Sequence, residues 1–350
     1  MERIKPEKLS SQMKNNSSAV KEKKQEYDGD FGTIISTGST LLDLNISGGR
    51  VHGGGLPGGI FVEAFGPSGS GKTVLLCEIA GGVQRQGGEI RFDDPEARLN
   101  VQFAKMFGLT VDEKNYAKPD TVTQVFDAIR KWKPEPEKNG IIHGTFTDSL
   151  AALSTDMEME NDEGDPFGGR RAKEFSEGLR KTCRLIKDKN YLMVCSNQVR
   201  DVIGATQYQA KTKSPGGKAL EFYPSLRLEF SGVKKIKLDK IIAGKKQTRI
   251  IGVEVNISVY KSSIWKPFRT APVTIIFDYG VDNIKENLQF IKDNTTNTVY
   301  TLGGQSLHKS MDEAIKIVEE DNLENELREE VITLWEEIEQ KFETERKPKR

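Results

Sequence analysis

The fold of this chain is decided by the stretch Gly66-Pro67-Ser68-Gly69-Ser70-Gly71-Lys72-Thr73, which matches G-x-x-x-x-G-K-[S/T] in full. Glycines let the backbone turn so tightly that several N–H groups point at one anion, and the following helix adds its positive N-terminal end. Lys72 would therefore reach the β- and γ-phosphates of ATP, and the Thr73 hydroxyl would bind Mg²⁺. A glycine-rich structural turn is the alternative interpretation.

The sequence on either side of this loop favours phosphate binding. The apolar run 60–65 predicts a buried strand that leads directly into the loop. Residues 72–84 are apolar on most sides, as expected of a helix that packs on a sheet. The motif thus lies between a predicted strand and a predicted helix, which is the setting that phosphate binding requires.

Short apolar runs alternate with helical patterns along much of the chain. Further strands are predicted at 89–92, 141–147 and 191–196, and helices at about 121–132 and around Phe175, Leu179 and Ile186. Three later runs fit antiparallel strands that extend the sheet, at 226–230, 252–259 and 273–277. This order predicts an α/β fold with a mostly parallel twisted sheet flanked by helices.

Composition shifts suggest three regions in the 350 residues. Residues 1–33 form a polar, lysine-rich N-terminal segment that is either flexible or docked on a neighbouring subunit. Residues 34–290 form the core. Residues 291–350 form a charged helical region with a basic tail. The 52 basic and 52 acidic side chains cancel, so any nucleic-acid site has to be a local patch.

Several features indicate a cytoplasmic protein that does not contact membranes. No apolar stretch approaches the roughly 20 residues needed to span a bilayer, and the first residues lead into no apolar signal core. Cys77, Cys183 and Cys195 show neither metal-ligand spacing nor an even count, which suits a reducing compartment.

Hydrolysis of a bound nucleotide needs a second oxygen ligand for the metal and a group that positions water. Asp148 ends the run 141–147, at the carboxyl edge of the sheet where ligands bind, so it is the candidate metal ligand; an Asp that caps a turn is the alternative. Glu96 follows the strand 89–92 and would orient and deprotonate the water, but Asp93 and Asp94 are rivals that spacing alone does not separate.

Gln198 follows the strand 191–196 at the same edge. Its amide would bond the γ-phosphate and report its loss to the next loop, or it is a solvent-facing residue at a strand end. Two long polar segments leave this edge, Asp156 to Gly169 and Arg200 to Gly217. The second carries Lys211, Lys213 and the pair Gly216-Gly217, and either DNA binding or a mobile lid over a small substrate would explain it.

Together these segments resemble the RecA family of recombinases, in particular its phage-encoded members, over roughly Ile35 to Ile291. The resemblance is carried by motifs in the family's order: Ser36-Thr37-Gly38-Ser39 with Leu42-Asp43-Leu44, Gly55-Leu56-Pro57-Gly58-Gly59, Asp94-Pro95-Glu96-Ala97 with Ala104-Lys105-Met106-Phe107-Gly108, Asp148-Ser149-Leu150-Ala151-Ala152-Leu153, Ser196-Asn197-Gln198-Val199-Arg200, and Pro215-Gly216-Gly217-Lys218-Ala219-Leu220-Glu221-Phe222-Tyr223.

The resemblance implies a RecA-like ATPase core that forms a helical filament on single-stranded DNA, pairs it with homologous double-stranded DNA, and binds ATP and Mg²⁺ between neighbouring subunits. It selects Glu96 over its aspartate rivals and places Phe103 against the adenine. For DNA, it implies that Phe167 and Ile203 are apolar wedges between base triplets, and that Lys173 and Arg200 contact phosphates.

This sequence departs from the family pattern in three places. Two lysines of bacterial members reach the neighbour's γ-phosphate; Lys261 matches the first, but Ser263 occupies the second position, and Lys266 lies three residues further on. The stretch 50–54 looks like an insertion, and the tail is basic where many relatives are acidic. A RecA-like helicase motor and a recombination mediator with weak ATPase activity are the alternative functions.

Overall fold

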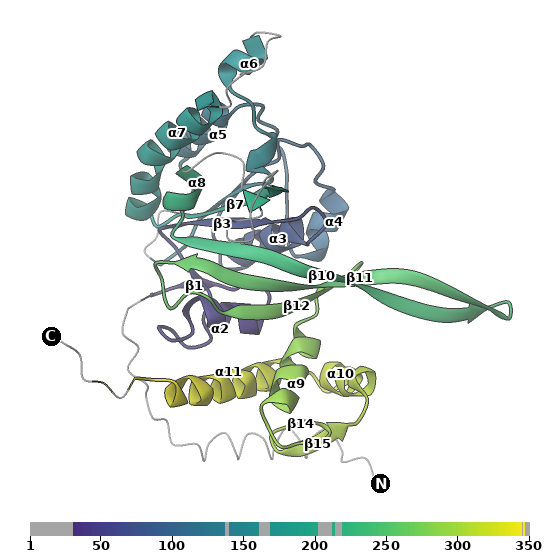
Figure 1. Cartoon of the computed structure of the whole chain (residues 1–350). Coiled ribbons are helices and arrows are strands. Elements are labelled where there is room, and N and C mark those ends of the chain that lie inside the picture. The colour runs from purple at the N-terminus through teal and green to yellow at the C-terminus, as the bar shows by residue number, and fades with distance from the viewer. Residues whose placement is uncertain are drawn as a thin grey trace.

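The computed structural model describes residues 31–136, 140–160, 169–201, 212–213, 219–344 and 346. Its centre is a nine-stranded sheet in the order β13-β12-β11-β10-β3-β7-β6-β4-β5 (Figure 1). These strands are β3 Ile60–Gly66, β4 Ile90–Asp93, β5 Tyr116–Ala117, β6 Gly144–Thr147, β7 Leu192–Gln198, β10 Leu226–Ile242, β11 Lys245–Ser262, β12 Thr270–Ile276 and β13 Gly280–Val281. In this order, neighbouring strands on the side from β10 to β5 run parallel, and neighbouring strands on the side from β13 to β10 run antiparallel. This arrangement confirms the predicted fold class.

Helices cover both faces of the sheet because successive residues of a strand point to opposite sides. On β3, Val62 and Ala64 pack in one cluster with the apolar residues of α3, whereas Phe61 packs in another with Phe126 and Phe175. The helices of the first face are α3 Lys72–Arg85 and α4 Val101–Met106; those of the second are α5 Val122–Lys131, α7 Gly169–Asp188 and α8 Ala219–Phe222. Shorter elements complete this part of the chain: β1 Ile34–Ile35, α2 Thr40–Ser47, β2 Leu56–Pro57, η1 Leu150–Ala152, α6 Asp156–Glu160, β8 Arg200–Asp201 and β9 Thr212–Lys213.

A buried ion pair ties two neighbouring strands together. Arg227 of β10 donates through Nε to Oε2 of Glu63 on β3 at 2.6 Å, and Asn197 donates to the other carboxylate oxygen at 3.0 Å. The guanidinium also lies over the ring of Phe65, 4.5 Å from its centroid. Since both charges are excluded from water, each depends on the other for compensation.

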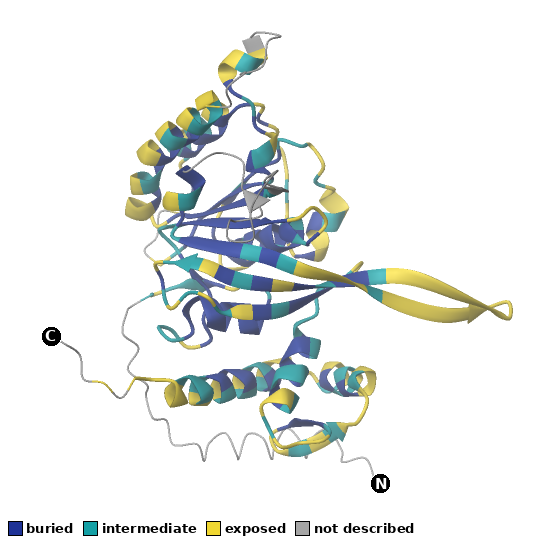
Figure 2. Ribbon diagram, in the orientation of Figure 1, coloured by how far each residue is buried: buried dark blue, intermediate teal, exposed yellow. Residues whose placement is uncertain are grey.

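The largest departure from the sequence prediction is the length of β10 and β11. The apolar runs predicted strands only at 226–230 and 252–259, but both strands continue well beyond the sheet and form a projecting hairpin, here called the arm and defined as residues 233–250 (Figure 1). Apart from Ile236, every residue of the arm is exposed (Figure 2). Apolar runs mark buried strands, so a strand without a buried face leaves no such signal.

The arm ends in a two-residue turn. Ala243 and Gly244 have φ values of 50° and 75°, and Ile242 pairs with Lys245 across them. Positive φ at both central residues is typical of a type I′ turn, whose twist matches that of the flanking strands. Local sequence thus defines the tip of the arm without any tertiary contact.

The elements after β13 form a separate layer beneath the edge of the sheet (Figure 1). They are α9 Asn283–Asp293, β14 Tyr300–Leu302, β15 Gln305–His308, α10 Met311–Glu320 and α11 Glu324–Lys341. The 3–4 spacing predicts that Leu327, Val331, Leu334, Ile338 and Phe342 share one apolar face; Leu327 and Val331 are buried, whereas Phe342 follows the end of α11 and is 77% exposed. Trp335, which that pattern does not include, is buried and packs on Trp265 with 5.4 Å between ring centroids. None of the helices in the described part of the chain has the length and apolar composition needed to cross a bilayer.

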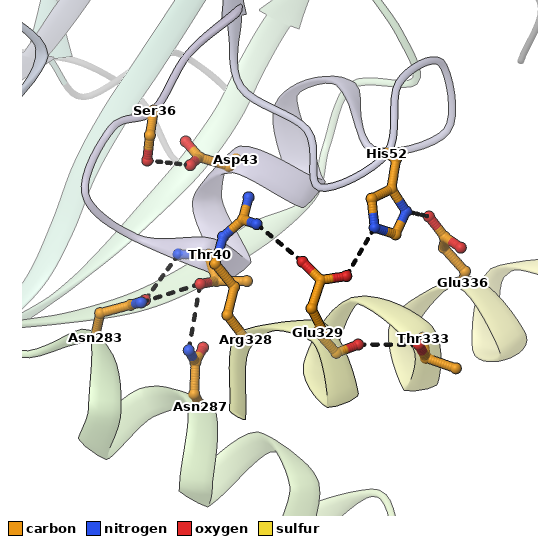
Figure 3. A network of polar contacts seen from close by, with 10 residues as sticks. All are labelled: Ser36, Thr40, Asp43, His52, Asn283, Asn287, Arg328, Glu329, Thr333 and Glu336. Carbon is orange, nitrogen blue, oxygen red and sulfur yellow. Dashed lines mark hydrogen bonds and ion pairs between the residues drawn. The ribbon is translucent and has the colours of Figure 1, made fainter. Parts of the chain in front are cut away.

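Polar contacts between α2, the segment after it, and the C-terminal helices fix this layer to the core (Figure 3). His52, in the stretch predicted to be an insertion, contacts Glu329 at 2.9 Å and Glu336 at 3.2 Å, both on α11. These two contacts raise the pKa of His52 to about 10. The protonated imidazole therefore bridges two carboxylates of the last helix at neutral pH.

Candidate active site

The phosphate loop connects β3 to α3, as predicted. Gly71 precedes the helix with a φ of 91°, and a Cβ atom at this position would lie 2.2 Å from the side chain of Ile275. Only glycine satisfies both the backbone conformation and this close approach. Lys72 folds back along the loop and donates to the carbonyl oxygens of Gly66 at 3.1 Å and Pro67 at 2.7 Å. Burial lowers the pKa of Lys72, while Asp148 and Glu96 act in the opposite direction.

Thr73 and Asp148 come together at the carboxyl edge of the sheet. The Thr73 hydroxyl donates to Oδ2 of Asp148 at 2.6 Å, and Ser196 donates to the other oxygen. Burial raises the pKa of Asp148, and these two hydrogen bonds partly offset that effect by stabilising the carboxylate. Both side chains therefore present oxygen atoms to one point, the donor type that Mg²⁺ prefers.

The three acidic candidates at the end of β4 and just after it have different partners. Arg91 holds Asp93 through two hydrogen bonds, at 2.7 and 3.1 Å, and burial raises the pKa of Asp93 to about 6. Asp94 accepts hydrogen bonds from the Leu99 backbone and the Tyr116 hydroxyl, both at 2.8 Å. Asp93 and Asp94 thus have structural partners that account for their burial.

Glu96 is held in a different way, by groups from two other segments and by a neighbour in its own loop. Ser149 donates to Oε1 of Glu96 at 2.8 Å, and Gln198 donates to the same oxygen at 3.3 Å. Arg98 contacts Oε2 at 2.7 Å. Glu96 and Gln198, which the sequence predicts as separate candidates, are in direct contact, and Ser149 and Arg98 are additions that the sequence did not single out.

These groups line one cleft of about 350 Å³ between the loop, α4 and the end of β12. Its polar part includes the loop from Ser68 to Thr73, Asp94, Glu96, Arg98, Asp148, Ser149 and Gln198. Its apolar part includes Phe103, Phe107 and Ile275, and the two phenylalanine rings pack edge to face with 4.8 Å between centroids. A polar end for phosphates next to an aromatic wall for a base is the chemistry that a nucleotide requires.

Lys261 lies away from this cleft. It is near the end of β11, where its Nζ donates to the carbonyl oxygens of Glu221 at 3.1 Å and Phe222 at 2.6 Å. Burial lowers the pKa of Lys261, and the neighbouring Arg227 lowers it further. Ser263 donates to the Ser225 carbonyl, and Lys266 lies 3.9 Å from Glu339 of α11.

The residues predicted to bind DNA are placed only in part. Lys173 is exposed on α7, and Arg200 pairs with Lys213 in the ladder of β8 and β9. Phe167, Ile203, Lys211, Gly216 and Gly217 lie outside the described residues.

Comparison with known proteins shows the family of this chain. Residues 11–282 match the family model described as the RecA N-terminal domain, a span that contains the whole cleft and the arm. The chain belongs to the RecA family. Protein RecA of Acholeplasma laidlawii is 31% identical over 304 residues, which cover 85% of this chain and 86% of that protein. Protein RecA of Colwellia psychrerythraea is 34% identical over 255 residues, or 73% of this chain and 69% of the relative.

The matched span of the N-terminal domain model ends at Asp282, the residue that caps α9, so α9, α10 and α11 follow it.

Proposed function

We propose that this chain is an ATP-dependent homologous recombination protein that forms a helical filament on single-stranded DNA and exchanges strands with a homologous duplex. The observation that carries the proposal is the contact of Glu96 with Gln198 in the cleft that also contains Lys72, Thr73 and Asp148. A carboxylate that can orient water thereby contacts the side-chain amide of Gln198, which is the last residue of β7 and leads into the segment that follows. Nucleotide state and the position of that segment would be linked through one hydrogen bond.

The residues of the cleft fit ATP and Mg²⁺. Thr73 and Asp148 supply two oxygen ligands, and Mg²⁺ characteristically takes few protein ligands and completes its shell with water and phosphate oxygens. Lys72 would exchange its bonds to the loop carbonyls for the β- and γ-phosphates, and Phe103 would pack on the adenine. The bound metal would neutralise the charge that develops on the phosphates.

Among the described residues that line the cleft the cations are Lys72 and Arg98, and Lys261 would add one on the far side of the γ-phosphate from the next subunit. Lys261 lies near the start of β10, at the opposite end of the sheet from the phosphate loop, so it would serve a neighbour's cleft in a head-to-tail assembly. A cation delivered in trans contributes on the order of 10³–10⁵ in rate to related reactions. ATP turnover would then depend on assembly.

The same proposal includes two further parts. One is that DNA is contacted by Lys173, Arg200, Lys213 and the segment from Arg200 to Gly217. The other is a phage origin.

The test measures ATP hydrolysis with and without single-stranded DNA, together with the formation of joint molecules from homologous strands. We expect DNA to stimulate hydrolysis and ATP to be required for pairing. Pairing that needs no ATP would overturn the proposal. Unwinding without pairing would indicate a motor, and DNA binding with background hydrolysis would indicate a mediator.

A variant pair assigns the hydrolysis to this cleft. Glu96→Gln should lower the hydrolysis rate by about 10²–10⁴ while ATP binding and assembly persist. Glu89→Gln is the matched control, because Glu89 precedes the same strand at its other end and is exposed. Loss of ATP binding in Glu96→Gln would show that Glu96 supports the cleft rather than the chemistry.

A further inference from the structure

The arm concentrates positive charge in a chain whose net charge is zero. Between Val233 and Ile250 there are seven Lys or Arg residues and one Asp. Asp239 is already engaged, by Lys246 at 2.8 Å and by the Thr248 hydroxyl at 2.6 Å. At about 3.3 Å per residue, the arm extends on the order of 30 Å from the sheet. A projection of this length and charge is a surface built to contact another molecule.

Both faces of the arm mix cations with apolar side chains. Cross-strand partners share a face, and the register places Leu238 with Arg249, Lys240 with Gln247, and Ile242 with Lys245 on one side. Ile241, on the other side, is 80% exposed, and Ile242 is 52% exposed. The apolar side chains require a partner that offers carbon surface as well as negative charge.

The arm leaves the sheet at the edge that contains the nucleotide cleft. Leu226–Glu229 of β10 pair in parallel with Val62–Phe65 of β3, and β3 continues directly into the phosphate loop. The arm is therefore the continuation of β10 past that loop. Any second copy that covers the cleft has to lie beside the arm.

Helix α11 offers matching chemistry at the opposite end of the sheet. Of its seven glutamates, Glu329, Glu330, Glu336 and Glu339 are already bonded within this chain, and Glu324 and Glu337 are exposed. Its second half packs on the connection between β11 and β12, through Trp335 on Trp265 and through Glu339 with Arg269. In the same part of the chain Glu337 and Glu343 are exposed, and Phe342 is 77% exposed. Acidic and apolar side chains thus occur together there.

We propose that the arm lies along helix α11 of the next copy of this chain and holds the two copies in head-to-tail register. The inference rests on the proposed function only in that a second copy covers the cleft. Duplex DNA is the competing partner, because a two-stranded ribbon fits the major groove. The exposed isoleucines favour a protein surface over a phosphate backbone, and so does the placement of α11 at the complementary end of the same molecule.

Charge exchange tests this contact. The arm variant carries Lys240→Glu with Lys245→Glu, and the helix variant carries Glu337→Lys with Glu343→Lys. We measure self-assembly by sedimentation without DNA, in the presence of Mg²⁺ and a non-hydrolysable ATP analogue. Each variant should raise the concentration at half-assembly by about tenfold or more, because like charges then face each other, and the combined variant should recover most of that loss.

Two controls separate the contact from general effects of charge. Lys131→Glu with Lys133→Glu makes the same charge change at exposed lysines near the end of α5, and it should assemble like the wild type. Replacement of residues 237–251 by Asn-Gly closes the hairpin directly after the pair Ile236 and Gly252, and it should weaken assembly as the arm variant does.

Three outcomes would overturn the proposal. The first is an arm variant that assembles at the same concentration as the wild type. The second is a combined variant whose concentration at half-assembly is as high as that of either single variant. Unchanged assembly with weaker binding to duplex DNA would assign the arm to DNA instead. Failure of strand pairing in the wild type would contradict the proposed function but not the contact between the arm and α11, because the assembly measurement contains no DNA.

Discussion

The hydroxyl of Thr73 lies 2.6 Å from the carboxylate of Asp148, although 75 positions separate the two residues in the chain. The contact joins the first turn of α3 to the end of β6, two elements that meet only because the intervening strands are parallel. It defines where a metal ion would be held.

Removal of this hydroxyl should therefore weaken the metal-dependent part of nucleotide binding. Thr73→Val keeps the shape of the side chain, and we expect Mg²⁺-dependent affinity for ATP to fall by at least about tenfold. Thr73→Ser restores the hydroxyl and should bind nearly as the wild type does. Titration of a fluorescent ATP analogue with Mg²⁺ and with a chelator measures both; an equal loss in the two conditions would mean that Thr73 only supports the loop.

Ser149 should act on turnover rather than on binding, because it positions Glu96. Its hydroxyl lies 2.8 Å from Oε1 of Glu96, and a hydrogen bond to a charged group is worth about 1.5–3 kcal/mol. In Ser149→Ala we expect kcat to fall by roughly 10–100-fold with KM for ATP nearly unchanged. Ser306→Ala, an exposed serine on β15, is the control. A rise in KM at constant kcat would contradict the positioning role.

The bridge from His52 to α11 should make stability depend on pH in a definite direction. Its contacts with Glu329 and Glu336 raise the pKa of His52 from 6.5 to about 10. The stabilisation is therefore complete below the unfolded pKa and is lost as the pH rises through about 10. Because His52 and Glu329 are about half exposed, solvent screening limits the contribution to on the order of 1 kcal/mol.

Thermal unfolding of wild type and His52→Gln measures this effect. The difference in Tm should be largest at about pH 6 and should shrink at about pH 11, where the imidazole is neutral. A difference that grows with pH would show that His52 stabilises the fold as a neutral group.

The buried pair of Glu63 and Arg227 should behave as one unit. Breaking it by Glu63→Gln leaves the guanidinium without its counter-charge, and we expect a loss of about 3–5 kcal/mol in the free energy of unfolding. Arg227→Met should cost a similar amount. In urea denaturation the double variant should lose much less than the sum of the two; additive losses would mean that the two side chains contribute independently.

The sequence predicted the parts of this molecule whose signals are local. The loop motif, the apolar runs of β3 and β7 and the spacing in α11 each specify an element, and the α/β fold follows from their order. The positions of Asp148, Glu96 and Gln198 at strand ends predicted that they meet, because parallel strands bring their carboxyl ends to one edge.

Other features lacked a local signal. Asp93, Asp94 and Glu96 look equivalent in sequence, and only their partners in space (Arg91, Tyr116 and Ser149) distinguish them. His52 is separated from Glu336 by 284 positions, so no pattern in either segment predicts their contact. The arm was missed for another reason, since an exposed strand carries no buried face and hence no apolar run.

The direction in which the arm leaves the sheet has a consequence for how the molecule grows into larger structures. In a chain of copies linked by arm and α11, every contact joins two different surfaces that lie at opposite ends of the fold, so the copies all point the same way, and the chain stays open unless the rotation between copies closes a ring. One terminus of such a polymer presents bare arms and the other presents an unoccupied acidic helix. Monomers would therefore add and depart at unequal rates at the two termini, and the polymer would have a polarity set by the protein before any DNA strand imposes its own.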